Sequence, residues 1–85
     1  MKLTVTKKAL RDLKGLPKDV AKDFLDRMEA IAADPFATNA NVERMKGMED
    51  AWRLRKGDWR ALYVVDRKAQ TVSLERVKHR REVYR

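Results

Sequence analysis

The chain has 85 residues, of which 44% are hydrophobic and 40% charged, and its formal net charge is +8. This length predicts one domain over residues 1–85, with a real but thin core. Cysteine is absent and His79 is the only histidine, which excludes disulfides and argues against a metal site, so we expect neither metal nor cofactor. Without a signal-peptide core or a membrane span, the chain is expected to be cytoplasmic, with no membrane contact.

The positive charge is concentrated in the second half of the chain. Residues 1–50 carry 10 Lys+Arg against 9 Asp+Glu, and residues 51–85 carry 11 against 4. The first half has 3 arginines and the second half has 8. Because the planar guanidinium grips phosphate through two hydrogen bonds, this half is predicted to bind phosphate. The plainer alternative is surface charge that only maintains solubility.

The first half predicts a short strand followed by two helices. Residues 2–5 fit a strand, and Thr6 can cap a helix that ends near Gly15. Residues 18–33 have one apolar stripe and one charged face, typical of an amphipathic helix. The short connection makes the pair a helical hairpin, which needs a sheet to cover its apolar side. Residues 36–41 are expected to form a loop.

Beyond the loop the hydrophobic pattern changes to a period of two. It predicts strands at residues 51–56, 59–66 and 71–78, arranged as an antiparallel meander. The predicted fold is therefore α+β: a short N-terminal strand, a helical hairpin and a three-stranded antiparallel meander. Together the strands are expected to form one four-stranded sheet with the helices on one face.

Two turns set the expected register of the meander. A Gly57-Asp58 turn pairs Arg55 with Arg60, and a four-residue turn at residues 67–70 pairs Arg60 with Val77. The side assigned to the helices then holds Trp52, Leu54, Ala61, Tyr63, Val65, Val72 and Leu74. The opposite side holds Arg53, Arg55, Arg60, Leu62, Val64, Ser73, Glu75, Val77 and His79.

The predicted pairing places like charges directly opposite each other. Arg55 faces Arg60, and Arg53 lies one pleat further along on the same side. Such a pair is destabilising by up to ~1 kcal/mol, so stability alone gives no reason for it. A bound polyanion would supply one, and the three arginines are therefore predicted to form an anion site.

Three stretches of the chain together resemble a known family. They are the dipeptide Lys46-Gly47, the core WRLRKGDWRALY at residues 52–63, and the ending HRREVY at residues 79–84. In these motifs, and in its order of elements, the chain resembles RelE-type toxins of the RelE/ParE toxin–antitoxin superfamily. One departure is that Arg53 and Arg55 stand where several relatives have lysines, which keeps the charge but removes a group able to titrate.

The resemblance implies a ribosome-dependent endoribonuclease that cuts messenger RNA in the ribosomal A site. It also implies a cognate antitoxin as partner, while no DNA-reading helix is apparent in this chain. The catalytic residues carried over are Arg53, Arg55, Arg60, Arg80 and Tyr84, with His79 and Arg81 as further candidates. The RNA-binding residues expected are Arg53, Arg55, Lys56, Arg60 and Arg81.

The implied reaction is attack of a ribose 2′-hydroxyl on the adjacent phosphate, without a metal ion. Arg60, with Arg53 or Arg55, would stabilise the charge of the transition state. Tyr84 is the family's candidate base, although a free phenol has a pKa of ~10.

Other roles in this reaction stay open. Arg80 or Arg81 would hold the leaving oxygen, and His79 could donate a proton. The plainer alternatives make Tyr84 a packing aromatic and His79 a hydrogen-bonding or stacking residue. Glu75 could be a local charge partner or the general base.

Two other functions remain open at this stage. A ParE-like toxin of the same superfamily would poison DNA gyrase and have no nuclease activity. A non-catalytic RNA-binding module would hold a nucleic-acid backbone on the arginine face without cutting it. The arginine set and the ending at residues 79–84 favour the nuclease.

Overall fold

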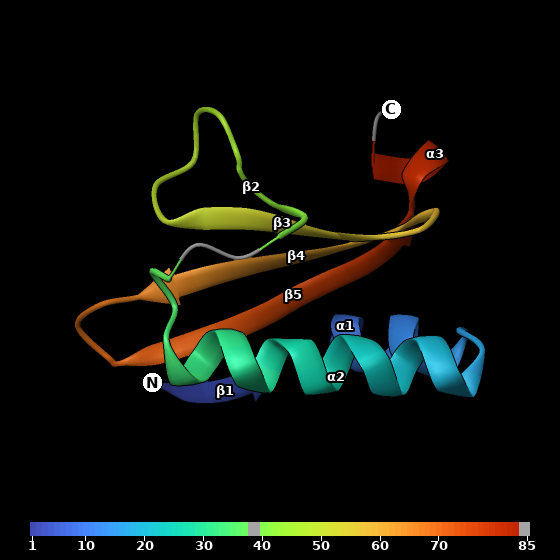
Figure 1. The fold of residues 1–85 in the computed structure, drawn as a ribbon, viewed down its shortest axis with the longest axis horizontal. Coiled ribbons are helices and arrows are strands. Elements are labelled where there is room, and N and C mark those ends of the chain that lie inside the picture. Colours follow the sequence, from blue (N-terminus) through green and yellow to red (C-terminus); the bar gives the residue numbers. More distant parts are fainter. Residues whose placement is uncertain (38–39, 84–85) are drawn as a thin grey trace.

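The structure, a computed structural model, describes residues 1–37 and 40–83. In chain order (Figure 1) the elements are β1 (Lys2–Val5), α1 (Lys7–Lys14), α2 (Lys18–Ala33), β2 (Val42–Arg44), β3 (Ala51–Lys56), β4 (Trp59–Asp66), β5 (Thr71–His79) and α3 (Arg80–Val83). Within the described ranges, no helix is long and apolar enough to cross a bilayer.

The strands form one mixed sheet in the order β1-β5-β4-β3-β2. Strand β1 runs parallel to β5, and the other neighbours are antiparallel. The predicted α+β class, helical hairpin and meander are confirmed, but the four-stranded sheet is wrong because β2 adds a fifth strand. With only three residues, β2 is too short to show an alternating hydrophobic pattern in the sequence. It is a strand because it pairs with β3.

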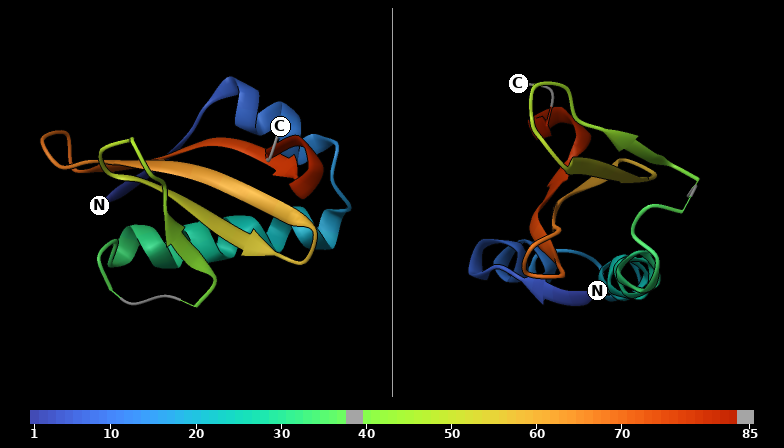
Figure 2. Two further views of the ribbon diagram at one scale, coloured as in Figure 1. Left: turned by 90° about the horizontal axis from the view of Figure 1, so that it is seen from above. Right: turned by 90° about the vertical axis from the view of Figure 1, so that its left-hand side faces the viewer.

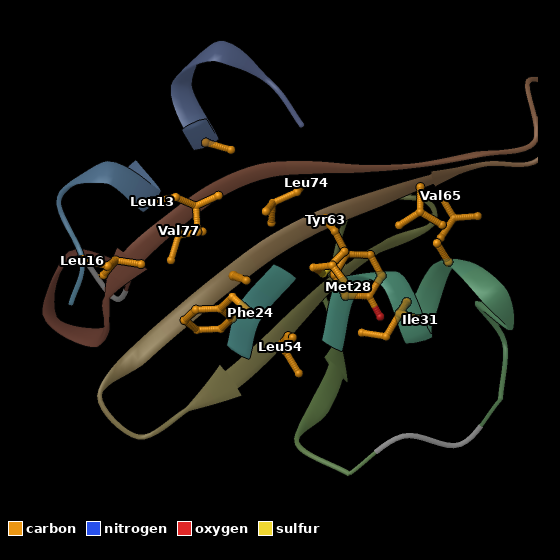
Figure 3. Close-up of a cluster of buried hydrophobic side chains, with 14 residues drawn as sticks. Leu13, Leu16, Phe24, Met28, Ile31, Leu54, Tyr63, Val65, Leu74 and Val77 are labelled. Carbon is orange, nitrogen blue, oxygen red and sulfur yellow. The ribbon is translucent and has the colours of Figure 1, made fainter. Parts of the chain in front are cut away.

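Both long helices lie on the same side of the sheet, below it in Figure 1. The sheet is strongly twisted, so that β2 lies above α2 in the right-hand view of Figure 2. Apolar side chains of both helices meet those of β3, β4 and β5 in one cluster (Figure 3). Its members are Ala9, Leu13, Leu16, Phe24, Met28, Ile31, Ala32, Leu54, Ala61, Tyr63, Val65, Val72, Leu74 and Val77.

Thr6 fixes the start of α1 and attaches it to the sheet. Its Oγ1 accepts a hydrogen bond from the N–H of Ala9 at 3.0 Å, which is the predicted N-cap. The same hydroxyl donates to the carbonyl of Glu75 at 2.9 Å. The N-terminus of α1 is therefore positioned directly by β5.

A β-bulge in β5 changes the predicted register. Tyr63 pairs with Leu74, but its neighbour Leu62 pairs with Arg76, so Glu75 is an extra residue. Arg60 consequently pairs with Lys78, and the predicted pairing of Arg60 with Val77 is wrong. The bulge also reverses the alternation of side chains, because it inserts one residue into a period of two.

Val77 shows the effect of the bulge. It was predicted on the arginine side, but it is 3% exposed and belongs to the core cluster. Figure 3 places its side chain near Leu13 and Leu16. The bulge therefore adds one apolar side chain to the face that the helices cover.

Asp12 of α1 accepts hydrogen bonds from the edge of β5 beyond the point where its pairing with β1 ends. Its carboxylate accepts from Nε of Arg76 at 2.8 Å and from the backbone N–H of Val77 at 2.9 Å. Burial on its own would raise the pKa of Asp12, but the hydrogen bonds from Arg76 and Val77 outweigh it, and the pKa lies below its usual range. A charged side chain thus takes the place of a strand neighbour.

Candidate functional site

The turn between β3 and β4 sets the register of the arginines. Gly57, at the first central position of the turn, has φ +55, a conformation that glycine adopts at little cost. Strand pairing then places Arg55 opposite Arg60 and Lys56 opposite Trp59. The predicted hairpin is confirmed, and the two guanidinium-bearing residues are direct neighbours across the sheet.

Three arginines line one depression of about 220 Å³, which we call the arginine pocket. Arg53, Arg55 and Arg60 contribute to it from β3 and β4, on the face opposite the core residue Leu54. The other lining residues are Asn41, Val42 and Glu43. The strand β2, absent from the sequence-based prediction, therefore forms one wall.

Arg60 is the most buried cation of the pocket, with 6% of its surface exposed. Its Nη1 donates to the carbonyls of Gly57 at 2.7 Å and of Trp59 at 2.8 Å. Among the described residues its Nε has no hydrogen-bond partner. A buried, unsatisfied donor costs roughly 1–3 kcal/mol, so this guanidinium is held in place at the expense of stability.

Glu43 is the one carboxylate in the lining of the arginine pocket. Nη2 of Arg53 donates to it at 2.9 Å, and this hydrogen bond lowers the pKa of Glu43. Arg55 instead reaches the neutral side-chain oxygen of Asn41 at 3.4 Å. The sequence analysis did not predict Glu43, because this residue reaches the pocket only through the pairing of β2 with β3.

A second depression of about 560 Å³ adjoins the first and is called here the edge pocket. The two share Asn41, Arg55 and Arg60. The remaining residues of its lining are Arg27, Lys56, Gly57 and Arg80. Arg27 belongs to α2 and was not predicted at the site, because nothing in its sequence neighbourhood distinguishes it from other exposed helix cations.

The structure separates Arg80 from Arg81. Arg80 lines the edge pocket, its N–H donates to the carbonyl of Asp58 at 2.7 Å, and its Nε lies 3.8 Å from the carboxylate of that residue. Arg81 is exposed and belongs to the lining of neither pocket. Of the two candidates, Arg80 is the one that the fold brings to Arg55 and Arg60.

Lys56 and His79 have other contacts. Lys56, a predicted RNA-binding residue, lines the edge pocket, and its Nζ also forms an ion pair at 3.0 Å with Asp23 of α2. His79 packs edge-on against Trp59, with ring centroids 5.3 Å apart, and its Nδ1 accepts from the N–H of Arg81 at 3.4 Å. The aromatic contact agrees with the stacking alternative for His79.

Glu75 lines neither pocket. Glu75, the alternative base, accepts a hydrogen bond from Ser73 at 2.6 Å, at the bulge. Tyr84 lies outside the described residues. Residues 1–37 and 40–83 contain no group of three side chains able to hold a metal ion.

Comparison with known proteins identifies the family. Residues 3–84 match the model of the ParE toxin of the type II toxin–antitoxin system parDE. The chain belongs to this toxin family. It is a RelE-type toxin of the RelE/ParE superfamily, as the motifs at residues 52–63 and 79–84 predicted.

The individual relatives carry RelE names. A curated protein of Methanocaldococcus jannaschii, "Putative toxin RelE1", is 28% identical over 82 residues, covering 95% of this chain and 91% of its own. The toxin in the archaeal RelE–RelB complex from Pyrococcus horikoshii is 26% identical, with a TM-score of 0.79 and coverage of 93% of each chain. The isolated Escherichia coli RelE toxin shares the fold, with a TM-score of 0.79, 23% identity and coverage of 98% of this chain and 89% of its own.

Proposed function

We propose that this toxin is a ribosome-dependent endoribonuclease that cleaves messenger RNA in the ribosomal A site and so inhibits translation. The observation that carries the proposal is the convergence of Arg53, Arg55 and Arg60 on one pocket. Arg60 in particular is buried with an unsatisfied donor. A phosphodiester backbone is a polyanion that this arrangement would bind.

The reaction we propose is attack of the 2′-hydroxyl on the adjacent phosphorus, which breaks the bond to the 5′ oxygen of the next nucleotide. The products are a cyclic phosphate and a free 5′-hydroxyl. Negative charge grows on the non-bridging oxygens in the transition state, where fixed guanidinium groups are most effective. Arg60 is held rigidly by two backbone carbonyls and is our candidate for this role, with Arg53 or Arg55 beside it.

Proton transfer would involve the C-terminal segment. Arg80 lines the edge pocket next to Arg55 and Arg60, which supports it over Arg81 as the cation near the leaving oxygen. Tyr84 follows four residues later in the sequence and is the proposed base, a role that would require nearby cations to favour the phenolate. His79 is a second candidate for proton transfer, as the proton donor.

An antitoxin is the proposed protein partner. The Pyrococcus horikoshii relative is named as a RelE–RelB complex, and the present chain matches 93% of that toxin. An acidic segment would be complementary to the second half of this chain, where 11 basic residues face 4 acidic ones. Expression in the cytoplasm, where ribosomes and such a partner meet, is part of the same proposal.

The alternative function is inhibition of DNA gyrase, which the ParE name of the matching family model favours. Gyrase inhibition does not require a buried arginine with one unsatisfied N–H in a pocket lined by two further arginines. RNA cleavage also requires groups for proton transfer beside the cations, which the ending at residues 79–84 provides. The nuclease is therefore our preferred function.

The deciding experiment maps 5′ ends on ribosome-bound transcripts after brief expression of the toxin. We expect new 5′-hydroxyl ends with the wild type and a loss of at least 100-fold in cleavage with Arg60→Ala, the order of magnitude for one transition-state donor. Arg11→Ala is the matched control, because Arg11 is exposed on α1 and lines neither pocket. Normal transcripts together with inhibited supercoiling would reject the nuclease in favour of the gyrase poison.

A further inference from the structure

We propose that Arg27 of α2 binds a second phosphate of the RNA strand, adjacent to the phosphate that is cleaved. The inference rests on the proposed function and extends it from one phosphate to two. It would make the helical hairpin part of the substrate-binding surface, although all residues carried over from the family lie on the strands and the C-terminal segment.

Arg27 reaches from α2 to the edge of the sheet. Its Nη2 donates to the carbonyl of Ala40 at 3.0 Å, and its Nη1 lies 3.4 Å from the carbonyl of Arg55. These contacts use two of the five N–H donors of a guanidinium. The side chain is thus fixed at the rim of the edge pocket with donors remaining for a ligand.

The charges around Arg27 are not balanced by its own helix. Asp23 lies one helical turn earlier and would be the natural i,i+4 partner, but its carboxylate pairs with Lys56 at 3.0 Å. Asp26, the residue before Arg27, forms an ion pair with Lys22 of the same helix. The described contacts of Arg27 are backbone carbonyls, which are dipoles and leave its full positive charge in place.

The two pockets are arranged for consecutive phosphates. They share Arg55 and Arg60, so a phosphate bound between these residues contacts both pockets. Arg53 lines only the arginine pocket, whereas Arg27 and Arg80 line only the edge pocket. A strand that places its reacting phosphate at Arg60 would therefore direct the neighbouring phosphate toward Arg27.

A purely structural role for Arg27 makes a different prediction. If the Arg27 side chain only connected α2 to Ala40 and Arg55, it would stabilise the fold and leave the ionic contacts to RNA unchanged. A phosphate contact adds one released counterion on binding, which steepens the salt dependence of the dissociation constant by about 0.7 in logarithmic slope. The slope therefore distinguishes the two roles.

The test measures the dissociation constant of a short, single-stranded 2′-O-methyl oligoribonucleotide, which cannot be cleaved, at several salt concentrations. We expect Arg27→Ala and Arg27→Gln to weaken binding and to reduce the slope by about 0.7, and Arg27→Lys to keep the wild-type slope. The exposed control Arg11→Ala should match the wild type. Melting temperatures verify that the variants are folded, and Arg27→Gln replaces Arg27→Ala if the alanine variant unfolds.

Kinetics on ribosome-bound message complete the test. A contact to a flanking phosphate that is equally strong before and during reaction raises KM and leaves kcat nearly unchanged. An unchanged salt slope in Arg27→Ala and Arg27→Gln, with cleavage intact, would overturn the second phosphate contact and leave the nuclease standing. Failure of the wild type to cut ribosome-bound message would instead reject the proposed function itself and this inference with it.

Discussion

Asp12 of α1 and Arg76 of β5 form a two-point ion pair, with Nε–Oδ2 at 2.8 Å and Nη2–Oδ1 at 3.4 Å, although 64 residues separate them. The carboxylate also accepts from the N–H of Val77. An asparagine in its place would keep one acceptor oxygen but lose the negative charge that strengthens the bonds from Arg76 and Val77. We expect Asp12→Asn to lower the free energy of unfolding by about 1–3 kcal/mol, measured by urea denaturation.

Asp26→Asn is the control for this substitution. Asp26 forms an exposed i,i+4 pair with Lys22, and solvent screening makes such a pair contribute little to stability. An equal effect of the two substitutions would contradict the structural role assigned to Asp12.

The depressed pKa of Asp12 predicts how stability responds to acid. Its pKa is lower in the folded than in the unfolded chain, so the unfolded chain binds the proton first as the pH falls. The stabilisation is complete above the unfolded pKa, near 4, and is lost as the pH falls through the folded value. The difference in unfolding free energy between the wild type and Asp12→Asn should therefore shrink below about pH 4 and stay constant between pH 6 and pH 8.

The β3–β4 turn predicts a contrast between two glycines. Gly57→Ala meets no atom within 4 Å, but φ +55 imposes backbone strain on any residue with a Cβ, and we expect a loss of about 1–2 kcal/mol. Gly15 has φ −84, an ordinary helical value, so Gly15→Ala should be neutral or slightly stabilising. Thermal denaturation measures both, and a neutral Gly57→Ala would show that the turn does not need its left-handed conformation.

The opposed arginines predict a trade between stability and binding. Arg55→Gln removes one of two like charges that face each other across β3 and β4, and we expect the free energy of unfolding to rise by a few tenths to ~1 kcal/mol. The same change should weaken binding of the uncleavable oligoribonucleotide. A variant that is more stable and binds equally well would remove the reason we give for the arrangement.

Glu43 should restrain the affinity of the arginine pocket. Its carboxylate holds Arg53 at 2.9 Å, and a bound phosphate must compete with it. Glu43→Gln removes that negative charge, so we expect tighter binding of the oligoribonucleotide, by several-fold at low salt, with the advantage shrinking as salt rises. Asp66→Asn is the control, because Asp66 is exposed and lines neither pocket.

Hydrophobic period and turn chemistry were sufficient to predict most of the fold. The strand at residues 2–5, the second helix at residues 18–33 and the meander follow from them, as does the pairing of Arg55 with Arg60. What they could not predict depends on contacts between distant segments. The three-residue β2 has too few residues to show a pattern, and the bulge at Glu75 reverses a parity that local sequence assigns to Val77.

The residues of the candidate site also fall into those predictable from local sequence and those that depend on contacts between distant segments. The set on β3 and β4 could be predicted because strand alternation and one tight turn determine its geometry. Glu43 and Arg27 reach the pockets only through the pairing of β2 and the packing of α2. Lys56 was predicted to bind RNA, and it lines the edge pocket. Its ion pair with Asp23, 33 positions away in the sequence, depends on the packing of α2 and could not be predicted.

The hydrogen bond from the N–H of Arg80 to the carbonyl of Asp58 connects α3 to the β3–β4 turn. The start of α3 is therefore attached to the same turn that sets the pairing of Arg55 with Arg60. Arg60 donates to the carbonyl of Gly57 in the same turn, so a distortion of the turn would move Arg60 and Arg80 together, although they are 20 positions apart in the sequence.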